Sequence, residues 1–229
     1  MCARFTTTQD AEAVFSETGL SPPADWRCHY NVAPSQGVLA VRHGDDDTRQ
    51  LATLRWGLLP SWANDKSLSS RLIMARAETV EEKPAYRDSF RVRRCALVAD
   101  GFYEWRRARG GNVPFYFRFS KPLFIAGIWD RWFEQGETIE SCAVLTTTAN
   151  ALVAGVHDRM PVLIGVDDLD VWLSPSSPRN VVRELLEPSP PEYLRVFAAD
   201  RAVNNPANDF PQLLGDYAEE ADWFGRAHP

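Results

Sequence analysis

The stretch that decides the fold reads Cys95-Ala-Leu-Val-Ala-Asp-Gly-Phe-Tyr-Glu-Trp-Arg106. Residues 95–99 form an apolar run, and residues 102–106 are rich in the aromatic side chains that favour strands. Asp100-Gly101 between them is a turn signal. The stretch therefore predicts two strands joined by a connection too short for a helical crossover.

The rest of the chain repeats this pattern of short strands and brief connections. The residue patterns predict further strands at 38–41, 50–56, 115–119, 124–129, 141–146 and 194–198, the first two forming a hairpin through the polar turn 44–47. They predict short helices at 10–18, 84–90, 149–153, 167–173 and 179–186. We therefore expect an α+β fold, a mainly antiparallel, barrel-like sheet with peripheral short helices, as a single domain over residues 1–229.

The composition excludes several classes of protein. The apolar run 123–128 is far shorter than the roughly 20 residues that span a bilayer, so we expect no membrane segment. The N-terminal residues lack a basic stretch followed by an apolar one, which favours a cytoplasmic protein. Cysteines 2, 28, 95 and 142 have neither CxxC spacing nor a histidine cluster, so we expect reduced thiols, no metal and no cofactor.

The charge is unevenly distributed. The net charge of −6 argues against a polyanionic partner at long range. However, seven arginines crowd into one stretch: Arg87, Arg91, Arg93, Arg94, Arg106, Arg107 and Arg109. They form either one basic face or a scatter of cations over a solvated surface.

Cys2 is the first candidate for chemistry. Removal of Met1 would leave Cys2 with a free α-amine and a thiol two carbons away. The amine can form a Schiff base with an aldehyde, and the thiol can then close a five-membered thiazolidine ring. An α-amine with a pKa near 8 is also deprotonated far more often at pH 7 than a lysine. Alternatively, Cys2 is only a small residue tolerated at this position.

Three further residues stand in suggestive surroundings. Glu104 lies between Tyr103 and Trp105, so burial is expected to raise the pKa of its carboxyl toward neutrality, where it can exchange protons. His157 is a candidate acid or base within a turn-like segment, although a lone histidine is commonly structural. Trp62 offers a surface on which a base can stack, whereas Trp56 is expected in the core.

Ordered blocks along the chain carry a resemblance to a known family. They are residues 2–5, 30–34, 56–62, 75–79, 101–105, 157–161 and 203–206. In this order, from residue 2 to about residue 214, they resemble the SOS response-associated peptidase (SRAP) family. The resemblance implies an abasic-site sensor that removes its own Met1 and crosslinks to abasic sites in single-stranded DNA through a Cys2 thiazolidine. It also implies a DNA partner, which we expect a monomer to bind.

The resemblance also implies roles for individual residues. Glu104 matches the residue that transfers protons in Met1 removal and crosslinking, and His157 matches one that assists opening of the abasic sugar. The phosphate contacts fall on three cations, Arg4, Arg76 and Arg159. Asn31 and Pro34 match the loop beside the active cysteine.

Two positions depart from the family pattern. Ala3 stands where glycine is usual, and Met74 replaces an asparagine implied to contact the lesion. A thioether cannot donate a hydrogen bond, so Met74→Asn is expected to accelerate crosslinking.

Two other functions remain open at this stage. The first is an N-terminal-nucleophile glutamine amidotransferase, in which the Cys2 thiol attacks the amide and its own amine serves as base. The second is a DNA-binding module that has lost its chemistry.

Overall fold

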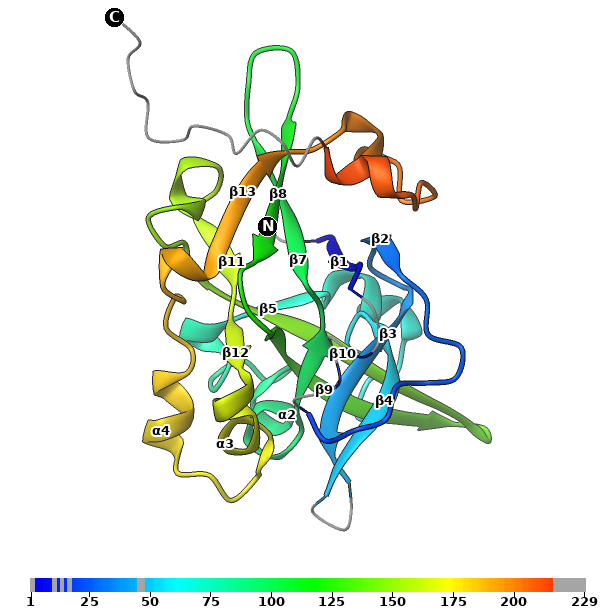
Figure 1. Ribbon diagram of the computed structural model, residues 1–229. Helices are drawn as coiled ribbons and strands as arrows, with labels where there is room; N and C mark the ends of the chain where they lie inside the picture. The colour runs from blue at the N-terminus through cyan, green and yellow to red at the C-terminus, as the bar shows by residue number, and fades with distance from the viewer. Residues whose placement is uncertain (1–2, 10–11, 13–14, 16–17, 45–47, 216–229) are drawn as a thin grey trace, which may run out of the picture.

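The computed structural model describes residues 3–9, 12, 15, 18–44 and 48–215. Its strands form two sheets (Figure 1). The five-stranded sheet is antiparallel throughout and has the order β13 (Leu194–Ala198), β8 (Val113–Phe119), β7 (Gly101–Arg106), β1 (Phe5–Thr7) and β2 (His29–Val32). The predicted helix at 10–18 falls largely outside the described residues.

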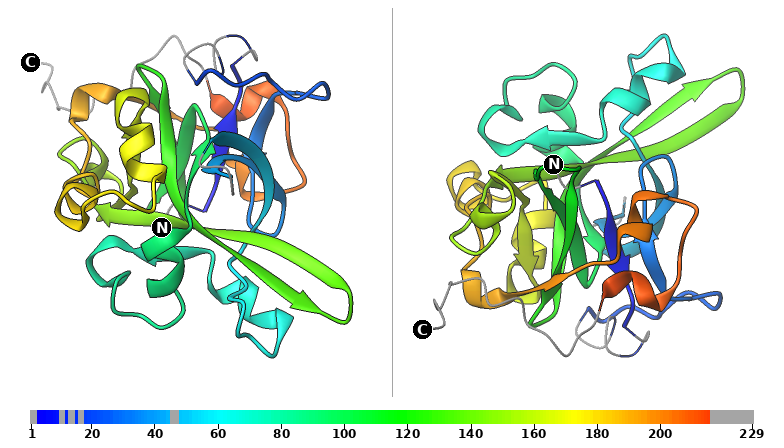
Figure 2. Two further views of the ribbon diagram at one scale, coloured as in Figure 1. Left: turned by 90° about the horizontal axis from the view of Figure 1, so that it is seen from below. Right: turned by 90° about the horizontal axis from the view of Figure 1, so that it is seen from above.

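The second sheet closes into a barrel. Its ring is formed by β10 (Glu137–Thr148), β4 (Arg49–Trp56), β3 (Gly37–His43), β6 (Arg94–Val98) and β9 (Leu123–Glu134), because β9 pairs back to β10. Three short strands extend it: β5 (Met74–Arg76), β11 (Arg159–Pro161) and β12 (Leu163–Gly165). The β9/β10 hairpin is long and projects from the body of the molecule (Figure 2). The barrel-like α+β fold is confirmed, although β10 pairs in parallel with β4 and β5.

The helices are few and short. Among the described residues they include α2 (Arg87–Val92), α3 (Leu169–Leu173) and α4 (Arg179–Glu184). Short 3₁₀ segments occupy Lys66–Arg71, Ala77–Thr79, Val153–Gly155, Val166–Asp168, Pro191–Tyr193, Arg201–Asn204 and Pro211–Leu214. The helix expected at 149–153 is therefore wrong, since only a 3₁₀ turn at its end forms.

Alternation along the strands sorts the buried side chains into separate cores. On β6, Cys95 and Leu97 face the barrel interior, here called the first core, which also receives Phe5 and Phe102 from the five-stranded sheet. Ala96 and Val98 face outward into the second core, which α2 and α3 cover with Phe90 and Trp172. A third core, including Tyr103 and Tyr116, lies on the outer face of the five-stranded sheet. This period-two sorting is what a strand imposes on its side chains.

The connection at Asp100-Gly101 carries the chain from the barrel into the other sheet. The two predicted strands form as β6 and β7, but they do not pair with each other. Gly101 is required here because an added Cβ would lie 2.5 Å from the Tyr116 ring and 2.7 Å from the Phe117 carbonyl oxygen. The crossing places β7 between β8 and β1.

Candidate functional site

Glu104 is the buried carboxyl at the centre of the candidate site. It lies on β7 and is 0% exposed, and it is two residues from Phe102, so both side chains point to the same face of the strand. Burial raises the pKa of Glu104 to about 7, and the charge of Asp158 adds to this rise. The rise expected from its aromatic neighbours is therefore confirmed, and the carboxyl can both donate and accept a proton near pH 7.

The N-terminal strand is held directly beside Glu104. β1 pairs with β7, Phe5 opposite Phe102, and the Tyr103 amide donates to the Arg4 carbonyl at 3.0 Å. One residue further along this register, Ala3 comes opposite Glu104. Cys2 is bonded to Ala3 and lies outside the described residues.

Asp100 fixes this strand in place. Its carboxylate is 3% exposed and accepts hydrogen bonds from the Thr6 hydroxyl, from the Thr8 amide and hydroxyl, and from the Gln9 amide at 2.7 Å. Several charge-assisted hydrogen bonds to one buried carboxylate hold a segment firmly. The turn that connects the two sheets thus also anchors the chain that leads to the site.

His157 lies in a loop that a buried asparagine organises. The Asn150 side-chain oxygen accepts from the amides of Leu152 at 3.1 Å and Val153 at 3.0 Å, while its nitrogen donates to the Ser189 carbonyl at 2.9 Å. The His157 amide then donates to the Val153 carbonyl at 3.0 Å. The backbone around the imidazole is therefore well defined.

Burial favours the neutral form of the His157 imidazole. Its Nδ1 accepts the Arg159 amide proton at 2.9 Å, so in the neutral ring the proton resides on Nε2. Asp158 Oδ1 also lies 3.0 Å from Nδ1 and would favour a protonated ring. Burial nevertheless outweighs this and lowers the pKa of His157. The charge of Asp158 raises the pKa of both His157 and Glu104.

Two short strands bring distant arginines to opposite sides of β10. Thr146 pairs with Arg76 on β5 and with Pro161 on β11. Arg76 is exposed, whereas the Arg159 guanidinium grips both oxygens of Glu78, with Nη2 to Oε2 at 2.9 Å. Met74, also on β5, is half-buried against the first core. Pairing with β10 thus brings together the two short strands that carry Met74, Arg76 and Arg159.

Arg4 lies directly before β1 and is half-buried. Its Nη1 donates to the Ala3 carbonyl at 2.9 Å, and burial lowers the pKa of its guanidinium. The cation therefore sits close to the first described residues of the chain.

Asn31 and its loop have a positioning role that the sequence alone did not reveal. The buried Asn31 amide nitrogen donates to the carbonyls of Val203 at 3.2 Å, Asn205 at 3.1 Å and Asn208 at 2.9 Å. The Trp105 indole donates to Asn204 in the same loop at 2.7 Å. The 203–206 block in the sequence was the signal for this contact. Asn31 therefore fixes that loop against β2.

The remaining candidates differ in exposure. Pro34 lies half-buried in the turn from Ala33 to Gln36, where Ser35 adopts a φ of 72°. Trp62 is 55% exposed, whereas Trp56 is 1% exposed and donates to the Ile73 carbonyl. Trp62 therefore presents a free aromatic surface, and Trp56 lies in the core as expected.

No helix in the described ranges is long and apolar enough to cross a membrane. No group of three or more metal-ligating side chains occurs among the residues that the structure describes.

Comparison with known proteins identifies the family. The profile of the SOS response associated peptidase (SRAP) family matches residues 1–206. The chain belongs to this family. The SRAP relatives include the abasic site processing protein YoaM of Bacillus subtilis, 36% identical over 93% of this chain and 97% of the relative. They also include the abasic site processing protein HMCES of Xenopus tropicalis, 30% identical over 81% of this chain and 65% of the relative.

Solved structures share the SRAP chain's fold. A crystal structure of a Bacteroides thetaiotaomicron protein superposes with a TM-score of 0.82 at 23% identity, covering 93% of this chain and 99% of that one. A Bordetella bronchiseptica protein gives a TM-score of 0.75 at 27% identity, covering 87% of this chain and all of that one. The family resemblance drawn from the ordered sequence blocks is confirmed.

Proposed function

We propose that this SRAP protein senses abasic sites in single-stranded DNA and shields them by covalent attachment through Cys2. The observation that carries the proposal is a buried carboxyl with a pKa of about 7, Glu104, beside the strand that leads to Cys2. The relatives named as abasic site processing proteins support the same substrate.

Cys2 first has to become the terminal residue. Hydrolysis of the Met1–Cys2 peptide bond consumes one water and releases methionine, leaving the Cys2 α-amine free. A nearby acid must protonate the departing amine, and Glu104 near its pKa can supply that proton. Glu104 therefore acts first in the removal of Met1, before any DNA is bound.

The crosslink forms in two steps. The Cys2 amine adds to the aldehyde carbon of the ring-opened abasic sugar, and loss of one water gives an imine. The thiol then adds to the imine carbon and its proton passes to the nitrogen, closing the thiazolidine. Glu104 moves protons to and from the leaving hydroxyl and the nitrogen, and neutral His157 assists opening of the sugar.

The cations around the site hold the DNA backbone. Arg4, Arg76 and Arg159 are assigned to phosphates, for which a guanidinium fork is suited. In the structure the Arg159 guanidinium binds both oxygens of the Glu78 carboxylate, so this ion pair has to open before Arg159 can hold a phosphate. Trp62 provides a stacking surface for a neighbouring base.

A denaturing gel tests the proposal. Incubation with an abasic single-stranded oligonucleotide should give a shifted band that survives boiling. The band should be absent with Cys2→Ala and with an undamaged oligonucleotide. Glutaminase activity without a shifted band would instead favour an amidotransferase, and reversible DNA binding alone would favour a module without chemistry.

A further inference from the structure

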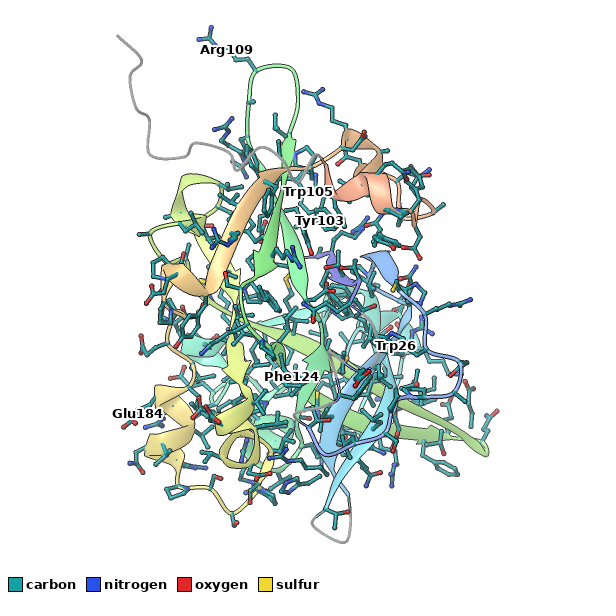
Figure 3. All side chains as sticks on the ribbon, viewed as in Figure 1. Trp26, Tyr103, Trp105, Arg109, Phe124 and Glu184 are labelled. Atoms are coloured by element: carbon teal, nitrogen blue, oxygen red, sulfur yellow. The ribbon has the colours of Figure 1, made fainter. Side chains whose placement is uncertain are left out.

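The arginines that crowd residues 87–109 do not form one face. The structure divides them between two ends of the molecule. Arg106 ends β7, and Arg107 and Arg109 lie on the connection from β7 to β8, with Arg109 at its tip in Figure 3. Arg87, Arg91 and Arg94 lie on or next to α2, where they line a pocket together with Arg179 of α4. Glu184 of α4 marks this second end in Figure 3.

The pocket is small and concave. Its volume is about 130 Å³, below the roughly 300–1,000 Å³ of sites for drug-sized ligands. Phe90, Val182 and Pro175 form its apolar lining, and Ser177 contributes a hydroxyl. The size suits a compact ion or a single terminal group.

The floor of the pocket carries a buried positive charge. Arg94 is 4% exposed, and its guanidinium donates to four carbonyls: Phe90, Arg91, Trp172 and Ser174. None of these acceptors is a carboxylate, so in the described part of the chain its charge has no ionic partner. The guanidinium also lies over the rings of Phe90 and Trp172, 6.0 and 5.7 Å from their centroids. A buried cation held by carbonyl dipoles and aromatic faces leaves a positive potential in the pocket that it lines.

The rim adds further cations. Arg91 and Arg179 are exposed and make no ion pair with any residue that the structure describes. Arg87 lies 3.9 Å from Asp88, a loose contact. Glu81 also lines the pocket, but both of its oxygens are bound by Arg183, at 3.0 and 2.5 Å. Four arginines thus line a pocket whose one lining carboxylate, Glu81, is already paired with Arg183, in a chain of net charge −6.

The pocket is separate from the site of Glu104. Phe90 and Val182 belong to the second core, outside the barrel. Phe102, on the same face of β7 as Glu104, belongs to the first core inside it. The proposed crosslinking chemistry makes no use of the pocket.

We propose that the pocket of Arg87, Arg91, Arg94 and Arg179 is a phosphate-binding site. The planar guanidinium groups of Arg91 and Arg179 each present paired donors to phosphate oxygens, and Arg94 supplies fixed positive charge beneath them. The phosphate group comes either from a free ion or from the backbone or end of a DNA strand. Both sources share the same chemistry.

Titration with inorganic phosphate at low ionic strength, followed by calorimetry and ³¹P NMR, tests the site. We expect saturable binding by the unaltered protein and a Kd at least about tenfold weaker for the Arg91→Gln/Arg179→Gln double variant. The Arg91→Lys/Arg179→Lys variant should lie between the two, because it keeps the charge but loses the paired donors. Arg55→Gln, which removes an exposed arginine from β4, is the matched control and should bind like the unaltered protein.

A second arm separates the two sources. Anisotropy of an undamaged single-stranded oligonucleotide, with and without a 5′-phosphate, is compared between the unaltered protein and the double variant. Weaker DNA binding by the variant assigns the pocket to strand phosphates, and equal DNA binding assigns it to a free ion. Absence of saturable phosphate binding, or equal Kd values for the unaltered protein and the double variant, overturns the proposal.

Discussion

Cys142 in the barrel interior and Glu104 on β7 are both 0% exposed, and burial raises the pKa of both groups. The thiol starts from a pKa near 8.5 and is driven further from neutrality, so it stays protonated and inert. The carboxyl starts near 4.3 and reaches about 7, where it is half protonated at physiological pH. Desolvation therefore makes the Cys142 thiol unreactive, whereas it brings the pKa of the Glu104 carboxyl to the range needed for proton transfer at physiological pH.

The barrel thiols give the largest expected contrast. Cys95 and Cys142 should react with iodoacetamide at least about 10³-fold more slowly in the native protein than in urea, because only unfolding exposes them. Mass spectrometry of labelled peptides measures this ratio. Equal labelling rates in the two states would show that the interior is open to solvent.

Replacing the Glu104 carboxyl tests the second buried group, whose pKa lies near neutrality. Glu104→Gln should slow crosslinking by about 10² to 10⁴-fold at pH 7, since an amide of the same shape cannot transfer the proton. Single-turnover gels with an abasic oligonucleotide give the rate. The exposed Glu187→Gln should react normally, and an unchanged rate for Glu104→Gln would remove this carboxyl from the chemistry.

The same substitution should alter stability in a pH-dependent way. The pKa of Glu104 is higher in the folded state, so its neutral form contributes stability below about pH 4.5, and this is lost as the pH rises through about 7. The free energy of unfolding of the unaltered protein should therefore fall, relative to that of Glu104→Gln, by roughly 1–3 kcal/mol between pH 5 and pH 8.5. Thermal unfolding at the two pH values measures the difference. A constant difference would mean that the carboxyl is not desolvated.

The rim of the site should respond more weakly than its buried centre. If Arg159 holds one phosphate, Arg159→Gln should weaken reversible binding of an abasic strand by about tenfold. It should also reduce the slope of the logarithm of the binding constant against the logarithm of the salt concentration by about one. Cys2→Ala serves as the background so that no crosslink forms. The Arg55→Gln control should change neither quantity, and identical salt slopes for the Arg159 variant would contradict the assignment.

The smallest expected change concerns Met74. Met74→Asn should accelerate crosslinking by about two- to tenfold, the value of one added hydrogen bond to the lesion. Its half-buried side chain packs against the first core, so the variant should also be less stable. Rates are compared at a temperature where both proteins are folded. Equal rates would remove Met74 from the site.

Much of the fold followed from local patterns. The β3/β4 hairpin and β13 were predicted because apolar strands and polar turns are adjacent in the sequence. The three-residue strands β5 and β11 were missed, since they are too short to show alternation and exist only through pairing with β10. The lack of pairing between β6 and β7 was also hidden, because the N-terminal strand takes the place beside β7.

The site was predictable where neighbours in sequence are neighbours in space. Aromatic residues on both sides of Glu104 foretold its burial. The role of Asn31 was not predictable from the sequence, because the three carbonyl groups that accept its hydrogen bonds lie more than 170 positions further along the chain. The division of the arginine run was equally invisible, because β6 and β7 carry its two halves to different ends of the molecule.

The central claim is that Cys2 offers nitrogen and sulfur to one carbon of an abasic sugar. Intact-mass spectrometry of the purified protein, before and after incubation with an abasic single strand, tests it most directly. The account predicts a chain lacking Met1, and then an adduct with the summed mass of protein and DNA less one water. A protein that lacks Met1 and keeps its thiol reduced, yet forms no adduct, would contradict it.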